Sequence, residues 1–327
     1  DYASGFGTNN GTQAQWRANC NNRDVANPEG GDHTVLPVFQ DCPPSNPIVI
    51  ENYCASPGNC DTIELDASPK RMNTATWSVC NGGACCGLSA PALPAAAQTF
   101  CTTSMNTGSS NYGMLWADPT SHTDAGTRML WAYEQGLSVG DSLLTSHDGS
   151  MLAGYFATVN GGHTIVARMA DGLSPATHDM RLATQAGDGG GEPISIYAAS
   201  GITIRRNPLG GVFALRGGSD GIVVDGGSTN ITLDGLTILA SGSREYGQCI
   251  RVTDGSYVTV KNSECKDSMA EGLAGYGGGN SSGTQMSNIV FDSNSVHDTG
   301  HAYEDGGGMT LSANLGMNMI IKNCNDC

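Results

Sequence analysis

The residues that decide the fold lie between positions 202 and 324, where one pattern recurs as ITIRRN (202–207), ITLDGL (231–236), VTVKNS (258–263), IVFDSN (289–294) and MIIKNC (319–324). The first residues of successive copies are 29, 27, 31 and 30 residues apart, so the period is nearly constant while the segments between the copies vary. Such a period is typical of a solenoid, in which each repeat stacks on its neighbours.

The first and third residues of every copy are apolar. Because alternate residues of a strand point to the same face, these positions predict one buried face per coil. The sixth position holds Asn207, Leu236, Ser263, Asn294 and Cys324 in the successive copies. We expect this position to lie at a turn inside the coil, where stacked side chains satisfy backbone groups.

A second strand precedes several copies, as in GIVVDGG (221–227), CIRVTDG (249–255) and GMTLSAN (308–314). Each coil therefore supplies at least two strands joined by tight corners, and the 46 glycines disfavour helical repeats. These repeats resemble the right-handed parallel β-helix repeat family, the pectate-lyase-like superfamily of polysaccharide lyases, glycosidases and tailspike proteins. The resemblance implies an all-β, right-handed parallel β-helix and does not specify the chemistry.

Three regions are expected along the chain. Residues 1–102 form a cysteine-rich N-terminal region, in which PIVIENYCASPGNCDTIELDA (47–67) is similar to a first coil of the helix. Residues 103–200 break the repeat and are predicted to be a β-rich insertion or elaborated coils, and residues 201–327 are the regular coils. The sequence stops at Cys327, close to a core position, which predicts either a truncated sequence or self-association through an open C-terminal end.

Composition narrows the partners and the compartment. The 31 acidic and 15 basic residues give a formal charge of −16, which disfavours nucleic acid and anionic lipid. No long apolar run predicts a membrane span. The twelve cysteines include no zinc-knuckle pairs and predict disulfides of unknown pairing. With a polar opening stretch, they favour an extracellular or cell-surface protein whose signal peptide has been removed.

The loops at 239–248, 266–272 and 297–307 leave equivalent strand ends, so we expect them to stack along one edge with about 4.8 Å between coils. The candidate catalytic residues of this stack are Glu271, Glu304, Asp305 and His301. The candidate substrate-binding residues are Arg244, Tyr246, Arg251, Lys266, Tyr276 and Tyr303. No other part of the chain concentrates titratable side chains so densely.

Two chemistries fit this stack on an extracellular polysaccharide. Carboxylates two coils apart, roughly 9–10 Å at the backbone, suit the acid and base of a glycosidase, with Glu271 paired to Glu304 or Asp305. A lyase would need a base and a cation beside the uronate, for which Arg251, Lys261, Lys266 and His301 are candidates. Ca²⁺ held by the acids could share that role, although no EF-hand loop is present and no other cofactor is indicated.

Two alternatives remain open at this point. Solenoid loops are polar simply because they face water, so the clustered acids need no function. The chain could equally be a structural or adhesive surface protein, such as a subunit of an extracellular filament or sheath, without catalysis. An enzyme would keep its loop acids accessible, whereas a filament subunit would bury its ends or loops against a neighbour.

Overall fold

The computed structural model describes residues 47–67, 75–80, 84–86, 88–89, 98–103, 112–131, 154–159, 164–184, 192–239, 241, 247–268, 270–277, 286–299, 308–313 and 317–324. In this part of the chain the regular structure is β-sheet together with a short 3-10 helix, η5 (Pro175–Thr177). The long parallel sheets confirm the predicted right-handed parallel β-helix.

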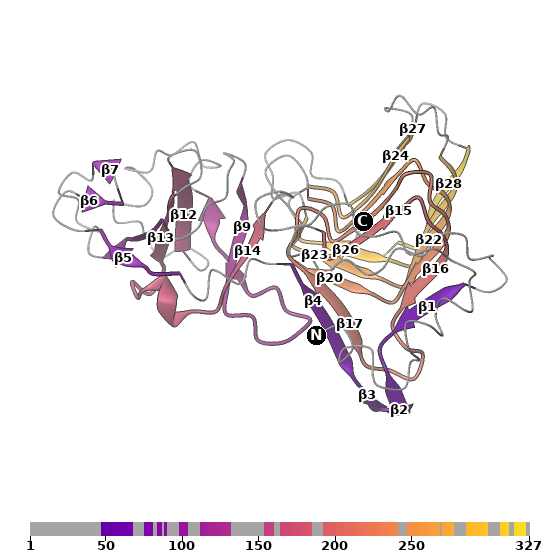
Figure 1. The fold of residues 1–327 in the computed structure, drawn as a ribbon, viewed down its shortest axis with the longest axis horizontal. Helices are drawn as coiled ribbons and strands as arrows, with labels where there is room; N and C mark the ends of the chain where they lie inside the picture. Colours follow the sequence, from indigo (N-terminus) through magenta and orange to yellow (C-terminus); the bar gives the residue numbers. More distant parts are fainter. Residues whose placement is uncertain are drawn as a thin grey trace.

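Three parallel sheets form the β-helix, which we call the coil stack. The first sheet contains β15 (Ile194–Tyr197), β18 (Ile222–Asp225), β21 (Ile250–Thr253), β24 (Leu273–Gly277) and β27 (Met309–Ala313). The second sheet contains β1 (Ile48–Glu51), β16 (Ser200–Arg205), β19 (Thr229–Asp234), β22 (Ser256–Lys261), β25 (Ser287–Asp292) and β28 (Met317–Lys322). The third sheet contains β4 (Thr62–Asp66), β17 (Val212–Arg216), β20 (Thr237–Leu239), β23 (Glu264–Lys266) and β26 (Ser295–His297). The chain visits the three sheets in turn, as Figure 1 shows.

The register of the second sheet matches the sequence repeat. Ile202 pairs with Ile231, which pairs with Val258, and each pairing is parallel. The predicted interior positions are buried in the copies that begin at residues 202, 231, 258 and 289. In β28, the last described strand, Met319 is half-buried and Ile321 is 40% exposed. The apolar first and third residues of the repeat therefore build the core of the coil stack.

The corners of the coils use residues that tolerate a left-handed backbone. Asn262, Ser293 and Asn323 lie between the second and third sheets with φ values of 51°, 57° and 51°. Next to this corner the predicted internal ladder is confirmed at two positions. The Ser263 N–H donates to Asn294 Oδ1 at 3.0 Å, and Asn294 Nδ2 donates to the Val260 carbonyl at 2.9 Å.

Residues 47–67 form the first described coil. Strand β1 pairs with β16 and β4 pairs with β17, both in parallel. Between them lies a hairpin of β2 (Cys54–Ser56) and β3 (Asn59–Cys60), closed by the Cys54–Cys60 disulfide. The segment that is similar to a first coil therefore belongs to the stack, with a hairpin in place of a tight corner.

The remaining strands form a mainly antiparallel part that lies beside the coil stack in Figure 1. One sheet contains β11 (Leu130–Trp131), β12 (Gly154–Val159), β13 (Thr164–Met169), β8 (Phe100–Thr102) and β5 (Ser78–Val79). A second sheet contains β10 (Thr127–Arg128), β9 (Tyr112–Ala117) and β14 (Met180–Thr184), and a separate hairpin contains β6 (Ala84–Cys85) and β7 (Leu88–Ser89). Because β8 precedes residue 103 and pairs with β13, this part draws its strands from both sides of that position.

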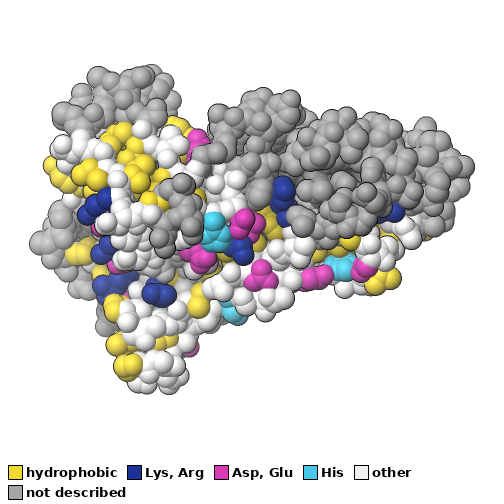
Figure 2. Space-filling model, turned by 180° about the vertical axis from the view of Figure 1, so that it is seen from behind, with side chains coloured by type: hydrophobic (Ala, Val, Ile, Leu, Met, Phe, Trp, Pro, Cys, Tyr) yellow, Lys and Arg dark blue, Asp and Glu magenta, His cyan; other side chains and the backbone are white. Residues whose placement is uncertain are grey.

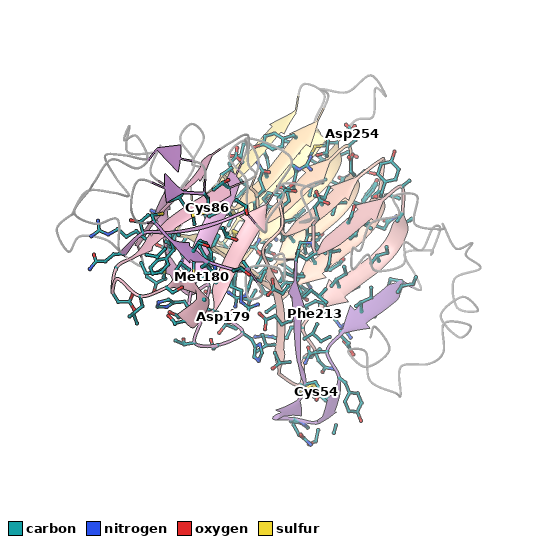
Figure 3. All side chains as sticks on the ribbon, turned by 60° about the vertical axis from the view of Figure 1, so that its left-hand side comes forward. Cys54, Cys86, Asp179, Met180, Phe213 and Asp254 are labelled. Atoms are coloured by element: carbon teal, nitrogen blue, oxygen red, sulfur yellow. A yellow bond between two sulfur atoms is a disulfide. The ribbon has the colours of Figure 1, made fainter. Side chains whose placement is uncertain are left out.

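The disulfides differ in where they lie. Cys249 and Cys265 are joined inside the core of the coil stack, where both side chains are buried, and their bond closes one coil into a ring. Cys86 and Cys101 are joined in the antiparallel part. Figure 3 places the labelled Cys86 and Met180 in that part and Phe213 in the coil stack. Every cysteine in the described residues is disulfide-bonded, as predicted.

Candidate functional site

The candidate site begins at the corner where the chain enters the first sheet. Strands β15, β18, β21 and β24 pair so that Ile194, Ile222, Ile250 and Leu273 are in register. Two residues before these positions stand Glu192, Asp220, Gln248 and Glu271, one for each coil. We call this column the acid ladder. Neighbouring members are separated by about 4.8 Å at the backbone.

Hydrogen bonds join the members of the acid ladder. The Gln248 backbone N–H donates to Asp220 Oδ1 at 3.0 Å, and Gln248 Nε2 donates to Glu271 Oε2 at 2.8 Å. One glutamine therefore links two carboxylates that are two coils apart. At the other end, Ser219 Oγ donates to Glu192 Oε1 at 3.0 Å.

Asp220 is the most deeply buried acid of the ladder, with its side chain 1% exposed. Arg251 Nε donates to Asp220 Oδ2 at 2.9 Å. Burial nevertheless raises the pKa of Asp220 to about 6, against the opposing effects of Arg251 and the Gln248 N–H and with added repulsion from Glu192. A carboxyl group in this state can change its protonation near neutral pH, which is common at functional sites.

Glu271, a predicted catalytic residue, is 8% exposed and bonded on both carboxylate oxygens. Gln248 donates to Oε2 and the Tyr276 hydroxyl donates to Oε1. Ser268 Oγ also donates to the Glu271 backbone carbonyl at 3.4 Å. These contacts hold the carboxylate at the edge of the first sheet, next to the outward side chains of that sheet.

The outer face of the first sheet carries a row that includes two tyrosines. Tyr197 pairs with Asp225, and Thr253 pairs with Tyr276, so all four point outward at equivalent positions of successive coils. Tyr197 is 60% exposed. Its ring lies over Gly226, where an added Cβ would come within 2.7 Å of Tyr197 Cε2. The glycine therefore leaves the space that the exposed ring occupies.

The structure brings together Glu271, Arg251 and Tyr276 among the predicted site residues and separates Lys266 from them. Lys266 is on β23, in the third sheet, where it pairs with Leu239 and His297. The charge of Lys266 acts on Asp124, in the antiparallel part. Burial raises the pKa of Asp124, but hydrogen bonds from Thr120 and Gly126, together with the charge of Lys266, outweigh burial and lower this pKa to about 2. Lys266 thus faces the antiparallel part rather than the acid ladder.

The other predicted site residues lie outside the described part of the chain: Arg244, Tyr246, His301, Tyr303, Glu304 and Asp305. Their roles stay predictions. Among the residues that the structure does describe, no group of three or more His, Cys, Asp or Glu side chains is arranged to hold a metal ion. The described acids therefore give no support for the Ca²⁺ site.

A second charged cluster joins the coil stack to the antiparallel part. Arg216 is 1% exposed, and its Nε donates to Glu64 Oε1 at 3.0 Å while Nη2 donates to the Asp124 carbonyl at 2.7 Å. His122 also bonds Glu64. Hydrogen bonds from His122 and Arg216 outweigh burial and hold the pKa of Glu64 below its usual range. In Figure 2, acidic, basic and histidine side chains gather where the two parts meet.

Histidines elsewhere are held by pairs of carboxylates. His297 contacts Glu264 at 3.1 Å and Asp298 at 2.9 Å, and these bonds outweigh burial and raise the pKa of the imidazole. His178 lies between Asp118 at 2.6 Å and Asp171 at 3.3 Å. These contacts fix local geometry, and neither histidine lies in the acid ladder.

Sequence reasoning missed Asp220, Gln248 and Glu192. Their signal is positional, because each stands two residues before the first interior residue of a first-sheet strand. The charged residues inside the loops draw attention away from the corners where the loops end, and these corners carry the ladder. An alignment anchored on the apolar strand starts would have placed all its members in one column.

No family model, no curated protein and no solved structure matches this sequence. The parallel β-helix is therefore shown by the strand pairing alone, and its place in the pectate-lyase-like superfamily stays a proposal. None of the helices in the described residues is long and apolar enough to cross a bilayer.

Proposed function

We propose that the chain is an extracellular, carbohydrate-active protein of the pectate-lyase-like superfamily. It binds a polysaccharide on the outer face of the first sheet and cleaves it with Glu271 as an acid–base residue. The observation that carries this proposal is the acid ladder, in which Gln248 links Asp220 and Glu271 beside the outward Arg251 and Tyr276.

The outer face of the first sheet suits a sugar chain. Tyr197 presents an exposed ring, and aromatic faces pack well against the C–H surfaces of pyranose rings. Asp225 and Thr253 stand in the same row and supply polar groups for sugar hydroxyls. A polysaccharide running along the row would cross successive coils and meet these groups in turn.

The position of Glu271 suits proton transfer. Equivalent residues on neighbouring coils and on coils two apart are separated by about 5 and 10 Å at the backbone. That range covers the carboxyl separations of retaining and inverting glycosidases. Glu271 paired with Glu304 or Asp305 is the predicted couple, while the buried Asp220 acts through Arg251 as a positioning residue.

Disulfides support the proposed compartment. Three are placed within the described residues, and one of them is in the core of the coil stack. Disulfides persist in oxidising surroundings such as the extracellular space. They support secretion of the protein.

The test is a panel of neutral and anionic polysaccharides, with binding measured by affinity electrophoresis and cleavage by new reducing ends or unsaturated uronates. Glu271→Gln is expected to lower the cleavage rate at least about a hundredfold while binding remains. Tyr197→Ala should weaken binding by up to about tenfold. Tyr257→Ala is the matched control, since Tyr257 is 58% exposed but lies on the second sheet. Failure of the wild-type protein to bind any glycan would overturn the proposal.

A second candidate is a structural or adhesive surface protein, including a filament or sheath subunit. The observation that favours it is the satisfied state of the ladder, because Asp220 and Glu271 are both buried and already hydrogen-bonded. Groups in this state can serve rigidity alone. Ordered polymers in electron micrographs, together with no glycan binding, would establish this candidate over the first.

A further inference from the structure

Acidic side chains surround Arg251 on the first sheet. Arg251 is the only Lys or Arg among the described strand residues of the first sheet. The attraction of Asp220, Glu192 and Asp225 raises the pKa of its guanidinium against burial. Three carboxylates therefore act on one guanidinium group, and Glu271 is a further acid of the ladder.

Arg251 is also committed to a partner. Its Nε donates to Asp220, whose side chain is 1% exposed. Turning Arg251 toward a substrate carboxylate would leave Asp220 buried without its cation, which is costly. The arginine is therefore held in place by Asp220, which offsets part of the charge that an anionic sugar would meet.

The lysines that sequence analysis offered to a lyase lie on other faces. Lys261 is in the second sheet and pairs with Asp234 at 3.2 Å. Lys266 is in the third sheet, where its charge acts on Asp124. Elimination from a uronic acid needs positive charge beside the carboxylate to stabilise the developing anion. Among the described strand residues of the face that carries Tyr197 and Tyr276, the only such charge is that of Arg251, which is already paired with Asp220.

We infer that the substrate is a glycan without carboxylate or sulfate groups and that it is cleaved by hydrolysis rather than by elimination. This inference rests on the proposed function and narrows its substrate class. In the reaction, one carboxyl group of the couple that includes Glu271 gives its proton to the glycosidic oxygen as the bond to the anomeric carbon breaks. Water adds to that carbon and gives its proton to a second carboxylate. No substrate carboxylate has to be neutralised.

The test compares three oligosaccharides of equal length with the intact protein: a neutral β-1,4-glucan, its amine-bearing counterpart and a polyuronate. Affinity is measured by calorimetry at low and moderate salt, and products are identified by mass spectrometry. We expect the best uncharged or amine-bearing ligand to bind at least about tenfold more tightly than the uronate, with a smaller gap at higher salt. Products should carry one added water for each bond cleaved. The glucan and the amine-bearing glucan separate a neutral sugar from an amino sugar.

A charge variant on the same face sharpens the test. Asp225→Asn removes one acid beside Arg251 and should raise uronate affinity about two- to threefold by relieving repulsion. Asp292→Asn is the matched control, because Asp292 pairs with Lys322 on the second sheet and should leave uronate affinity unchanged.

The outcomes are distinguishable. Preferred binding of the uronate, or an unsaturated product that depends on Glu271, would overturn the substrate class while leaving a carbohydrate-active protein. The absence of binding to all three ligands and to the wider polysaccharide panel would overturn the proposed function, and this inference would fall with it.

Discussion

The coil stack and the antiparallel part are stabilised in different ways. In the coil stack every strand pairs with its equivalent one turn later, and a single apolar column runs through the coils. The antiparallel part has a smaller cluster around Met129, Ile165 and Met180 and no repeating register. Stability in a solenoid is a sum over similar neighbours. In the antiparallel part it depends on individual contacts, such as the Cys86–Cys101 bond.

The largest expected effect breaks the apolar column. Phe291 on β25 is fully buried, so Phe291→Ala should lower the free energy of unfolding by about 3–5 kcal/mol through the cavity it leaves. Val290→Ala, on the outward face of the same strand, is the control and should cost under about 1 kcal/mol. Urea unfolding would measure the free-energy change of each variant. Hydrogen exchange would show which strands lose protection. If Phe291→Ala speeds exchange more in β13 than in β22 and β28, the neighbouring coils do not stabilise each other through the apolar column.

The stability of the two parts should depend on pH in opposite ways. Asp220 has a folded pKa of about 6, above its ordinary 3.8, so its folded form holds the proton longer than the unfolded chain. The free energy of unfolding should therefore fall by roughly 3 kcal/mol as the pH rises from about 4 to 6. Asp124 has a pKa of about 2, and its contribution is lost only as pH falls below about 4.

Asp220→Asn tests this assignment, because asparagine keeps the shape of the side chain but cannot titrate. Hydrogen exchange between pH 4 and 7 should show the coil stack losing stability with rising pH in the wild type and much less in the variant. The antiparallel part should behave alike in both proteins. An unchanged slope in the variant would show that another group titrates.

The repeat predicts the coil stack because each coil obeys the same local rule. Ile231 and Leu233 could be placed in the core from the sequence alone, since neighbouring copies have apolar residues at the same positions. No such rule covers Arg216, whose partner Glu64 is 152 residues away and whose other acceptors lie in the loop between β9 and β10. Asp220 lies between these cases, because its column repeats while its residue type does not.

The next effect concerns the junction of the two parts. Arg216→Met removes the buried bonds to Glu64 and to the Asp124 carbonyl. We expect a loss of about 2–3 kcal/mol, below the usual cost of breaking a buried pair because Glu64 keeps some contact with water. Arg205→Met is the control, since its bond to Glu51 is on an exposed face and should be worth under about 1 kcal/mol.

Hydrogen exchange gives the location of that loss. Strands β9 and β14 should exchange faster in Arg216→Met, while the first sheet stays protected. An equal loss of protection in both parts would mean that they unfold as one unit and are not stabilised separately.

The smallest expected effect uses the equivalence of coils, which the antiparallel part lacks. Asn230, Tyr257 and Asn288 occupy one position of the second sheet, and all have left-handed φ values between 51° and 56°. Asparagine tolerates this conformation better than a bulky residue does. Tyr257→Asn should therefore raise the free energy of unfolding by about 0.5–1 kcal/mol. Tyr197→Asn is the control in urea unfolding, because Tyr197 is equally exposed but is not in the left-handed region. A gain in both variants would trace the effect to the exposed ring, and a gain in Tyr257→Asn alone would trace it to the backbone of the repeat.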